Sequence, residues 1–513
     1  MTVSYPAFDP NQIFDLLVIG GGINGVGIAR DATGRGLRVL LVERDDLASH
    51  TSSASTKLIH GGLRYLEYYE FRLVRESLQE RERLIRIAPQ ISWPLRFVLP
   101  QPEGGRPGWM IRIGLFLYDH IAGRHSLPKS HGVNLRDPNW GKGLKPGLSK
   151  GFVYSDAWVD DARLVALNAI DAAQRGATIL TGTAVSGAEQ QGDAWAVTLE
   201  PNADAPAPAI AAPCTVRART IVNAAGPWVA SMLGNLAGAK RDGAIKLVKG
   251  SHIVVPRIYP GDHAFILQQD DGRIVFTIPY EGQFTLVGTT DVAVGEEERA
   301  RPKISAEEIA YLCAAANRYF ERQIAPADVV WTYSGVRPLF DDGQEDAKAV
   351  TRDYVLKLGR AEGPQVLSVF GGKLTTYRRL AEHALDDLRP WMAGSGKAWT
   401  DTVPLPGGDL GTGGFAAFLQ QARERWPFVP AQTMERMAHA YGTRIAMILG
   451  EAQGWQDLGS DFGGGLTEAE VRYLQAYEWA RSAEDVLWRR SKLGLTAAPD
   501  MAEKLAFWFK ANA

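Results

Sequence analysis

The stretch that decides the fold is Asp15-Leu-Leu-Val-Ile-Gly-Gly-Gly-Ile-Asn-Gly25. The apolar, branched run after Asp15 predicts a buried parallel β-strand. Gly20, Gly22 and Gly25 then complete a G-x-G-x-x-G pattern. The first glycine allows a tight turn, the second lets the backbone approach a pyrophosphate, and the third lets the next helix pack closely on the strand. We therefore predict a dinucleotide site at the N-terminus of that helix, where free N–H groups and the helix dipole favour an anion.

A second strand is expected over residues 37–42, and Glu43 stands at its end, 23 positions after Gly20. An acidic side chain at this place can accept hydrogen bonds from a ribose diol. A basic residue would instead favour a 2′-phosphate, so Glu43 argues against NADP. Strand, glycines, helix, second strand and acid follow in the order that a dinucleotide-binding unit requires.

The chain after Glu43 favours FAD over a nicotinamide cofactor. Instead of further strand–helix units it gives a polar loop, His50-Thr-Ser-Ser-Ala-Ser-Thr-Lys57, whose hydroxyls and amides can surround a pyrophosphate. Residues 220–228 and 367–377 supply two more strand-to-glycine junctions, and three such junctions suit an extended FAD. The expected FAD contacts are Gly20, Gly22, Gly25, Glu43, Thr51, Ser52, Ser53, Ser55, Thr56, Lys57, Ala184, Val185, Ala225, Gly226, Trp228, Gly371, Gly372, Lys373, Leu374 and Thr375.

Two further regions complete the expected fold, which is of the α/β class. Short strands at 251–256, 264–268, 273–279 and 284–288, separated by turn signals, predict an antiparallel sheet that roofs the flavin. Beyond a Pro- and Gly-rich boundary at 404–409, helical segments near 415–426, 431–441, 443–451, 467–478 and 482–492 predict a helical cap.

The expected domain organisation has a Rossmann-like FAD-dependent region over residues 1–400 and a C-terminal helical domain over 401–513. Within the first region, the FAD-binding parts are about 1–90, 150–245 and 335–395. The interleaved substrate domain is about 91–149 and 246–334.

Residues 20–27, 52–67, 154–163, 249–256, 331–339 and 370–377 together resemble the aerobic glycerol-3-phosphate dehydrogenase family, within the glycine oxidase and D-amino-acid oxidase superfamily. The resemblance covers nearly the whole chain. It implies oxidation of sn-glycerol 3-phosphate to dihydroxyacetone phosphate by hydride transfer to FAD, with electrons passed to quinone. It also implies a peripheral protein on the inner face of the cytoplasmic membrane, and it allows a homodimer.

Cations within these motifs suit a dianionic phosphate, because guanidinium groups bind phosphate bidentately and lysine adds a point charge. By resemblance the substrate residues are Arg64, Tyr65, Arg337, Arg352 and Lys373. Arg337, His252 and Lys373 are the expected catalytic residues. Arg337 would stabilise a developing alkoxide, and either His252 or His60 could remove the hydroxyl proton.

Composition limits the other function classes. A formal net charge of −2 argues against nucleic acid as a partner, and two unrelated cysteines, Cys214 and Cys313, predict neither a disulfide framework nor a metal site. This cysteine usage suits a reducing cytoplasm. No secretory signal or membrane-spanning run is expected. The apolar segment 109–118 is interpreted as a core helix, with a membrane-surface helix as the alternative. Residues 72–86 are interpreted as an ion-paired helix, with attraction to anionic lipid as the alternative.

Three alternative functions stay open at this point. The first is an oxidase that passes electrons to oxygen and releases hydrogen peroxide. The second is an amine oxidase of the same superfamily, which the cationic cluster disfavours. The third is a nucleotide-binding regulatory or RNA-modifying flavoprotein, which the net charge disfavours.

Overall fold

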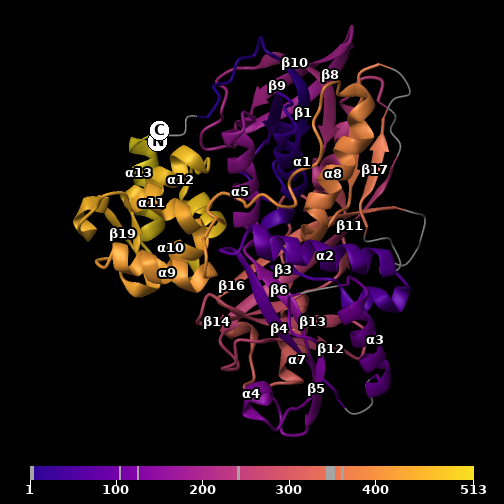
Figure 1. The fold of residues 1–513 in the computed structure, drawn as a ribbon, viewed down its shortest axis with the longest axis vertical. Coiled ribbons are helices and arrows are strands. Elements are labelled where there is room, and N and C mark those ends of the chain that lie inside the picture. The colour runs from indigo at the N-terminus through magenta and orange to yellow at the C-terminus, as the bar shows by residue number, and fades with distance from the viewer. Residues whose placement is uncertain are drawn as a thin grey trace.

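The computed structural model describes residues 5–102, 106–123, 126–239, 243–341, 353–359 and 363–512. Two sheets are stacked end to end along the long axis of the molecule, and a helical C-terminal domain lies beside the junction between them (Figure 1). This arrangement confirms the expected α/β fold with an antiparallel-sheet region and a helical cap.

The first sheet is the Rossmann-like one, with the order β17-β18-β10-β1-β2-β7. Its central strands are parallel, and β1 lies between β10 and β2. Helices α1 (Ile23–Gly34), α5 (Asp161–Gln174) and α8 (Tyr377–Leu388) pack on one face in a shared apolar core. The strands are β1 (Ile13–Ile19), β2 (Val39–Val42), β7 (Thr178–Leu180), β10 (Cys214–Asn223), β17 (Val355–Leu358) and β18 (Val366–Phe370), with β8 (Thr183–Gln191) and β9 (Ala194–Pro201) joined through β10.

The second sheet is mostly antiparallel, with the order β15-β11-β14-β13-β12-β4-β6-β3. β16 pairs with β11, and β5 pairs with β6. The strands are β3 (Leu58–Ile59), β4 (Ser92–Pro100), β5 (His131–Asn134), β6 (Lys150–Val159), β11 (Ile245–Pro256), β12 (Ala264–Gln268), β13 (Ile274–Tyr280), β14 (Phe284–Gly288), β15 (Val292–Ala293) and β16 (Trp331–Phe340). Between strands of this sheet in the sequence lie helices α2 (Phe71–Ile87), α3 (Gly108–His120), α4 (Pro138–Gly141) and α7 (Ala306–Asn317).

The strands expected at 264–268 and 284–288 have those bounds. β6 differs from the expected division, because we assigned residues from 150 onward to the FAD-binding part. β6 instead pairs with β4 from Ser92 to Pro100. The pattern of an apolar strand does not say which distant strand it will pair with, so sheet membership was not visible locally.

The C-terminal domain has its own apolar core. Its helices are α9 (Gly414–Arg425), α10 (Ala431–Tyr441), α11 (Ile445–Leu449), α12 (Glu468–Tyr477) and α13 (Met501–Ala511), with a π-helix at Asp485–Arg490. The sequence predicted helices near all of these except α13. The helix expected at 482–492 is thus a short π-helix, a form that is frequent at functional sites.

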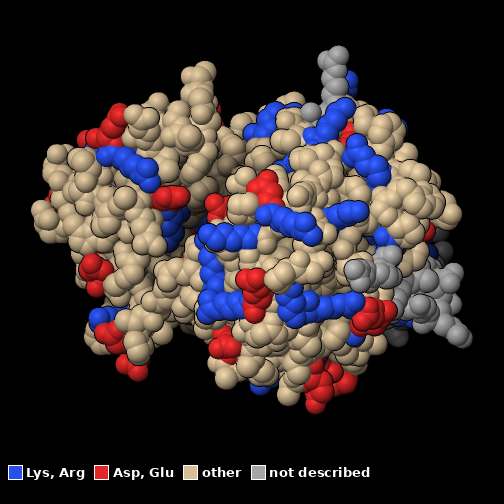
Figure 2. Space-filling view, turned by 90° about the horizontal axis from the view of Figure 1, so that it is seen from below, with Lys and Arg blue, Asp and Glu red and all other residues tan. Residues whose placement is uncertain are grey.

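Helix α3 contains the apolar segment 109–118, and only one face of this helix is buried in the core. Ile111, Leu115 and Tyr118 are buried, while Trp109 and Phe116 are 69% and 55% exposed. The core interpretation therefore holds for one face only. No helix among the described residues is long and apolar enough to cross a bilayer. Lys and Arg side chains gather on the lower face of the molecule (Figure 2).

Gly34 of helix α1 packs so closely on Trp399 that adding a single methyl group tests the contact. A Cβ on Gly34 would lie 2.0 Å from the ring of Trp399, whereas a Cβ on Gly114 of α3 would meet nothing within 4 Å. We expect Gly34→Ala to displace Trp399 and lower the free energy of unfolding by about 1–3 kcal/mol. Gly114→Ala is the matched control. It should raise the free energy of unfolding by up to about 1 kcal/mol, since glycine is unfavourable within a helix. Urea unfolding measures both; a Gly34→Ala protein as stable as the wild type would contradict the packing.

Candidate active site

One cavity of about 800 Å³ runs from the carboxyl end of β1 in the first sheet to the inner face of the second sheet. Its walls come from all three strand-to-glycine junctions that the sequence singled out. Its lining includes the apolar and aromatic side chains of Ala184, Val185 and Trp228. It also includes the cationic side chains of Arg64, Arg337 and Lys373.

The first junction is a backbone contact that only glycine permits. Gly20 has φ +108°, and a Cβ there would lie 2.6 Å from the carbonyl oxygen of Ala224 at the end of β10. A Cβ on Gly25 would lie 1.9 Å from the carbonyl oxygen of Gly20. Gly20 and Gly22 line the cavity, while Gly25 serves the packing of α1. The N-terminus of α1 consequently opens into the cavity.

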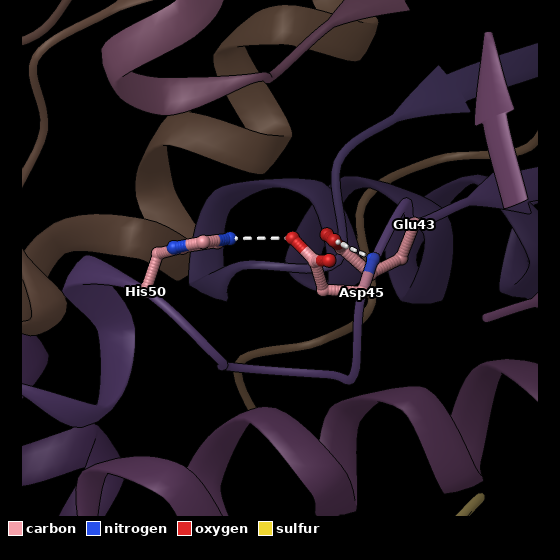
Figure 3. Close-up of side chains that lie close together, drawn as sticks. All are labelled: Glu43, Asp45 and His50. Atoms are coloured by element: carbon pink, nitrogen blue, oxygen red, sulfur yellow. Dashed lines mark hydrogen bonds and ion pairs between the residues drawn. The ribbon is translucent and has the colours of Figure 1, made fainter. Parts of the chain in front are cut away.

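Glu43, Asp45 and His50 lie close together beside the first junction (Figure 3). The Glu43 carboxylate accepts hydrogen bonds from the backbone N–H groups of Gly21 at 2.6 Å and Asp45 at 2.8 Å. Burial raises the pKa of Glu43. Asp45 in turn lies 2.8 Å from Nε2 of His50 and accepts a hydrogen bond from Asn202. Glu43, Asp45 and His50 are close enough to hold a metal ion, but these hydrogen bonds already occupy their ligand atoms, so we assign them a hydrogen-bonding role.

The hydroxyl loop lies along the cavity, though not every residue of it faces inward. Thr51, Ser52, Ser55 and Thr56 line the cavity. Ser52 also accepts a hydrogen bond from the first N–H of α1 at 3.0 Å. Two expected cofactor contacts, Ser53 and Lys57, do not line it.

Lys57 points away from the cavity because it has a buried partner. Its ammonium lies 2.7 Å from Asp161 at the start of α5, which also accepts a hydrogen bond from the Ser55 hydroxyl. A cation that is paired in this way anchors the loop. It does not offer a charge to a ligand.

The other two junctions complete the cavity wall. Ala225, Gly226 and Trp228 follow β10, and Gly371 to Thr375 follow β18; all of them line it. Gly371 and Gly372 have φ +71° and +100°. Asn24 donates a hydrogen bond to the Gly371 carbonyl at 3.2 Å, while its own side-chain oxygen is buried with no hydrogen-bond partner among the described residues. That oxygen is available to a ligand.

The expected substrate-binding cations line the same cavity, with one exception. Lys373 lies 3.7 Å from the ring centre of Tyr65, and Arg64 donates a hydrogen bond to Tyr68 at 3.4 Å. Nε of Arg64 is buried and has no partner within the described part of the chain. Arg337 projects from β16 and forms an ion pair with Asp291. Arg352, the remaining expected substrate residue, lies outside the described residues.

The two candidate histidines occupy different places. His60 lines the cavity, and burial together with the charge of Lys373 lowers its pKa to about 4. His252 is fully buried behind the wall: its Nε2 lies 3.0 Å from the Thr56 hydroxyl, and its ring stacks on Tyr333. His252 therefore reaches the cavity only through Thr56.

Comparison with known families matches residues 15–378 to a family described as "FAD dependent oxidoreductase". The chain belongs to this family. Residues 398–510 match a second family, "C-terminal domain of alpha-glycerophosphate oxidase". The protein is thus an FAD-dependent oxidoreductase with an additional C-terminal domain.

Named relatives of this FAD-dependent oxidoreductase extend over nearly its full length. It is 50% identical to a D-erythritol 1-phosphate dehydrogenase of Brucella abortus, over 96% of this chain and 97% of the relative. It is also 50% identical to a glycerol-3-phosphate dehydrogenase of Pseudomonas aeruginosa, over 98% and 96%. Among solved structures, a glycerol-3-phosphate dehydrogenase from Bacillus halodurans complexed with FAD matches with a TM-score of 0.77 at 27% identity, covering 98% of this chain and 91% of that one.

The residues of the cavity fit FAD. The glycine turn brings backbone to the place where a pyrophosphate would bind, Glu43 lines the cavity beside that turn, and the unpartnered oxygen of Asn24 faces the third junction. Sequence reasoning missed residues that line the cavity, among them Asn24, Arg44, Tyr154, Asn202 and Asp291. Asn24 lies inside the glycine motif and Arg44 directly follows Glu43, so both could have been found from the sequence. The other three come from distant segments that only the fold brings together.

Proposed function

We propose that this FAD-dependent oxidoreductase oxidises sn-glycerol 3-phosphate to dihydroxyacetone phosphate. The observation that carries the proposal is that three cationic side chains, Arg64, Arg337 and Lys373, line the same cavity as the glycine junctions. Two full-length relatives at 50% identity are named for phosphorylated polyols, which supports the same substrate class. The choice of glycerol 3-phosphate within that class follows the relative from Pseudomonas aeruginosa.

Substrate phosphate would be held by the cations nearest the cavity wall. Arg64 offers an unpartnered buried N–H, and Lys373 is held in place against the face of Tyr65. A guanidinium and an ammonium together match the two negative charges of a phosphate monoester. An alcohol without this anionic group would gain nothing from these two half-buried cations, so the site favours the phosphate ester.

Arg337 suits a different task, because Asp291 already neutralises much of its charge. The ion pair and a 3.3 Å hydrogen bond from Arg337 to the Thr289 hydroxyl fix the orientation of the guanidinium. A positioned donor of this kind stabilises negative charge as it develops on the substrate oxygen without reorganising during the reaction.

His60 is the better candidate for the base. It lines the cavity, and its lowered pKa keeps the imidazole neutral at pH 7, so that a ring nitrogen is free to accept the proton of the substrate hydroxyl. FAD, when bound, supplies the hydride acceptor. Holding His60, Arg337 and the phosphate-binding cations on separate elements of the second sheet and the third junction lets the protein orient the carbinol and exclude water around it.

The first prediction concerns the substrate. Purified protein, kept free of oxygen, should lose the visible absorbance of its oxidised flavin when glycerol 3-phosphate is added and should keep it when glycerol is added. D-erythritol 1-phosphate is the third arm, because the Brucella abortus relative is named for it. Bleaching by the four-carbon ester alone would replace glycerol 3-phosphate as the substrate, and bleaching by glycerol would refute the role of the cations.

A second prediction separates the two histidines. His60→Asn should lower kcat by at least about 100-fold, the usual contribution of a general base, while KM for the phosphate ester stays within a few-fold. His252→Asn should change kcat far less, since His252 does not reach the cavity. Flavin content is measured for both variants as a control. Equal losses of kcat in the two variants would assign the proton transfer elsewhere.

We further propose that the protein binds the surface of a membrane through α3 and passes its electrons to a quinone there. The outer face of α3 presents Trp109, Ile113 and Phe116 to solvent, all more than half exposed. Residues 106–150 hold eight Lys or Arg and two Asp. The α3 and β5 elements of this stretch lie at the lower end of the molecule, on the side that Figure 2 shows. Apolar side chains beside basic ones suit the interface of an anionic bilayer.

The membrane proposal predicts sedimentation with lipid vesicles that contain anionic phospholipid. The double substitution Ile113→Glu and Phe116→Glu should abolish this sedimentation, because it places carboxylates where apolar side chains would enter the lipid. Phe507→Glu, which changes an exposed apolar residue on α13, is the matched control and should sediment like the wild type. Unchanged binding of the double variant would exclude α3 as the contact.

A further inference from the structure

Buried ion pairs join the C-terminal domain to the segment beside the FAD cavity. Arg489 and Arg490, the last residues of the π-helix, both bind Asp46 of the first domain. Arg489 lies 2.6 Å from one carboxylate oxygen, and Arg490 lies 2.8 and 2.7 Å from the two. Burial acts to raise the pKa of Asp46, but Arg490 and Arg489 hold it below its usual value, so the carboxylate stays charged.

Asp46 is placed where its position controls the cofactor wall. In the chain it lies between Glu43, which lines the cavity beside the glycine turn, and the polar loop that begins at His50. The next two residues pack on the glycine turn: the Leu47 side chain touches Gly21, and the Ala48 N–H donates a hydrogen bond to the Gly21 carbonyl at 3.2 Å. A shift of Asp46 would therefore move the segment that covers the first junction.

The far end of the same loop is linked to the C-terminal domain as well. Ser55 and Lys57 are bound by Asp161, as described above. The preceding residue, Asp160, faces the buried ammonium of Lys492 at 3.6 Å, just beyond the π-helix. The charge of Lys492 and that of Lys57 both lower the pKa of Asp160 against the opposing effect of its burial. The loop 44–57 is thus held at Asp46 by two arginines of the C-terminal domain, and its far end is held by Asp161, whose neighbour Asp160 faces Lys492 of that domain.

We propose that the C-terminal domain is a clamp that retains FAD. Arg489 and Arg490 hold Asp46, and Asp46 holds the loop 44–57 in the conformation that covers the cofactor. A loop that is ordered before binding does not have to be ordered by the ligand, so the cofactor binds more tightly and leaves more slowly. If Asp46 loses its charge, water cannot solvate the two guanidinium groups in its place, because the side chains of Arg489 and Arg490 are only 11% and 1% exposed.

The test measures FAD retention in the full chain. Asp46→Asn keeps the shape of the side chain and removes its charge. We expect its FAD dissociation constant, and the rate at which flavin fluorescence appears after dilution, to rise roughly tenfold or more. If Asp46→Asn does not fold, Arg489→Gln is the milder variant, since Arg489 is the more exposed of the two arginines, and a several-fold rise is expected.

A matched control separates retention from general destabilisation. Glu470 pairs with Arg436 inside the C-terminal domain at 2.6 and 2.8 Å, is fully buried and does not touch the loop. Glu470→Gln should lower Tm as Asp46→Asn does but leave the FAD dissociation constant unchanged below the transition. An equal rise in the FAD dissociation constant in Asp46→Asn and Glu470→Gln would overturn the proposal. An unchanged dissociation constant in Asp46→Asn would overturn it as well.

A double-substitution cycle then asks whether the contact itself carries the effect. Arg490→Gln alone should raise the FAD dissociation constant. The double variant with Asp46→Asn should have a dissociation constant no higher than that of the weaker-binding single variant, because both substitutions remove the same interaction. Losses that simply multiply would mean that the residues act independently of each other, and the clamp would be refuted.

Discussion

The contact among Gly20, Gly25 and Ala224 is the constraint on which the rest of the molecule depends. Here the end of β1, the first turn of α1 and the end of β10 meet backbone to backbone, with no room for a single Cβ on either glycine. This contact directs the amide groups of α1 into the cavity and brings the second junction beside the first. The position of every other wall of the cavity is set relative to it.

Because the cavity spans two sheets, the chain has to cross between them repeatedly. β3 lies in the second sheet only a few residues after the hydroxyl loop, and β16 and β18 bring Arg337 and the third junction to the same end. The cations therefore come from segments more than 270 residues apart in the chain, Arg64 near its start and Lys373 beyond residue 370. This crossing places the redox cofactor and the anion-binding groups in one enclosed space.

The sequence was sufficient where function is local. The glycine turn, Glu43, the hydroxyl loop and the third junction each carry their signal within a few residues, and those segments lie where they were expected. It was insufficient where a partner is distant. Lys57 was expected to contact the cofactor, but its ammonium pairs with the buried Asp161. His252 was the expected catalytic histidine and His60 the alternative for the proton, and only the fold shows that Thr56 lies between His252 and the cavity. Asp291 carried no signal, since its meaning comes from Arg337.

The ion pairs around Asp46 also bear on how the two parts of this chain evolved together. The family boundaries near residues 378 and 398 suggest two modules that could be exchanged. The charges do not respect that division: Arg163 of α5 is paired with Glu478, and Asp46 with two arginines, all across the boundary and all buried or nearly so. A C-terminal domain from another protein, without matching charges, would leave Asp46 and Arg163 buried and unpaired. Recombination between lineages should therefore succeed only when the paired residues of both domains are inherited together.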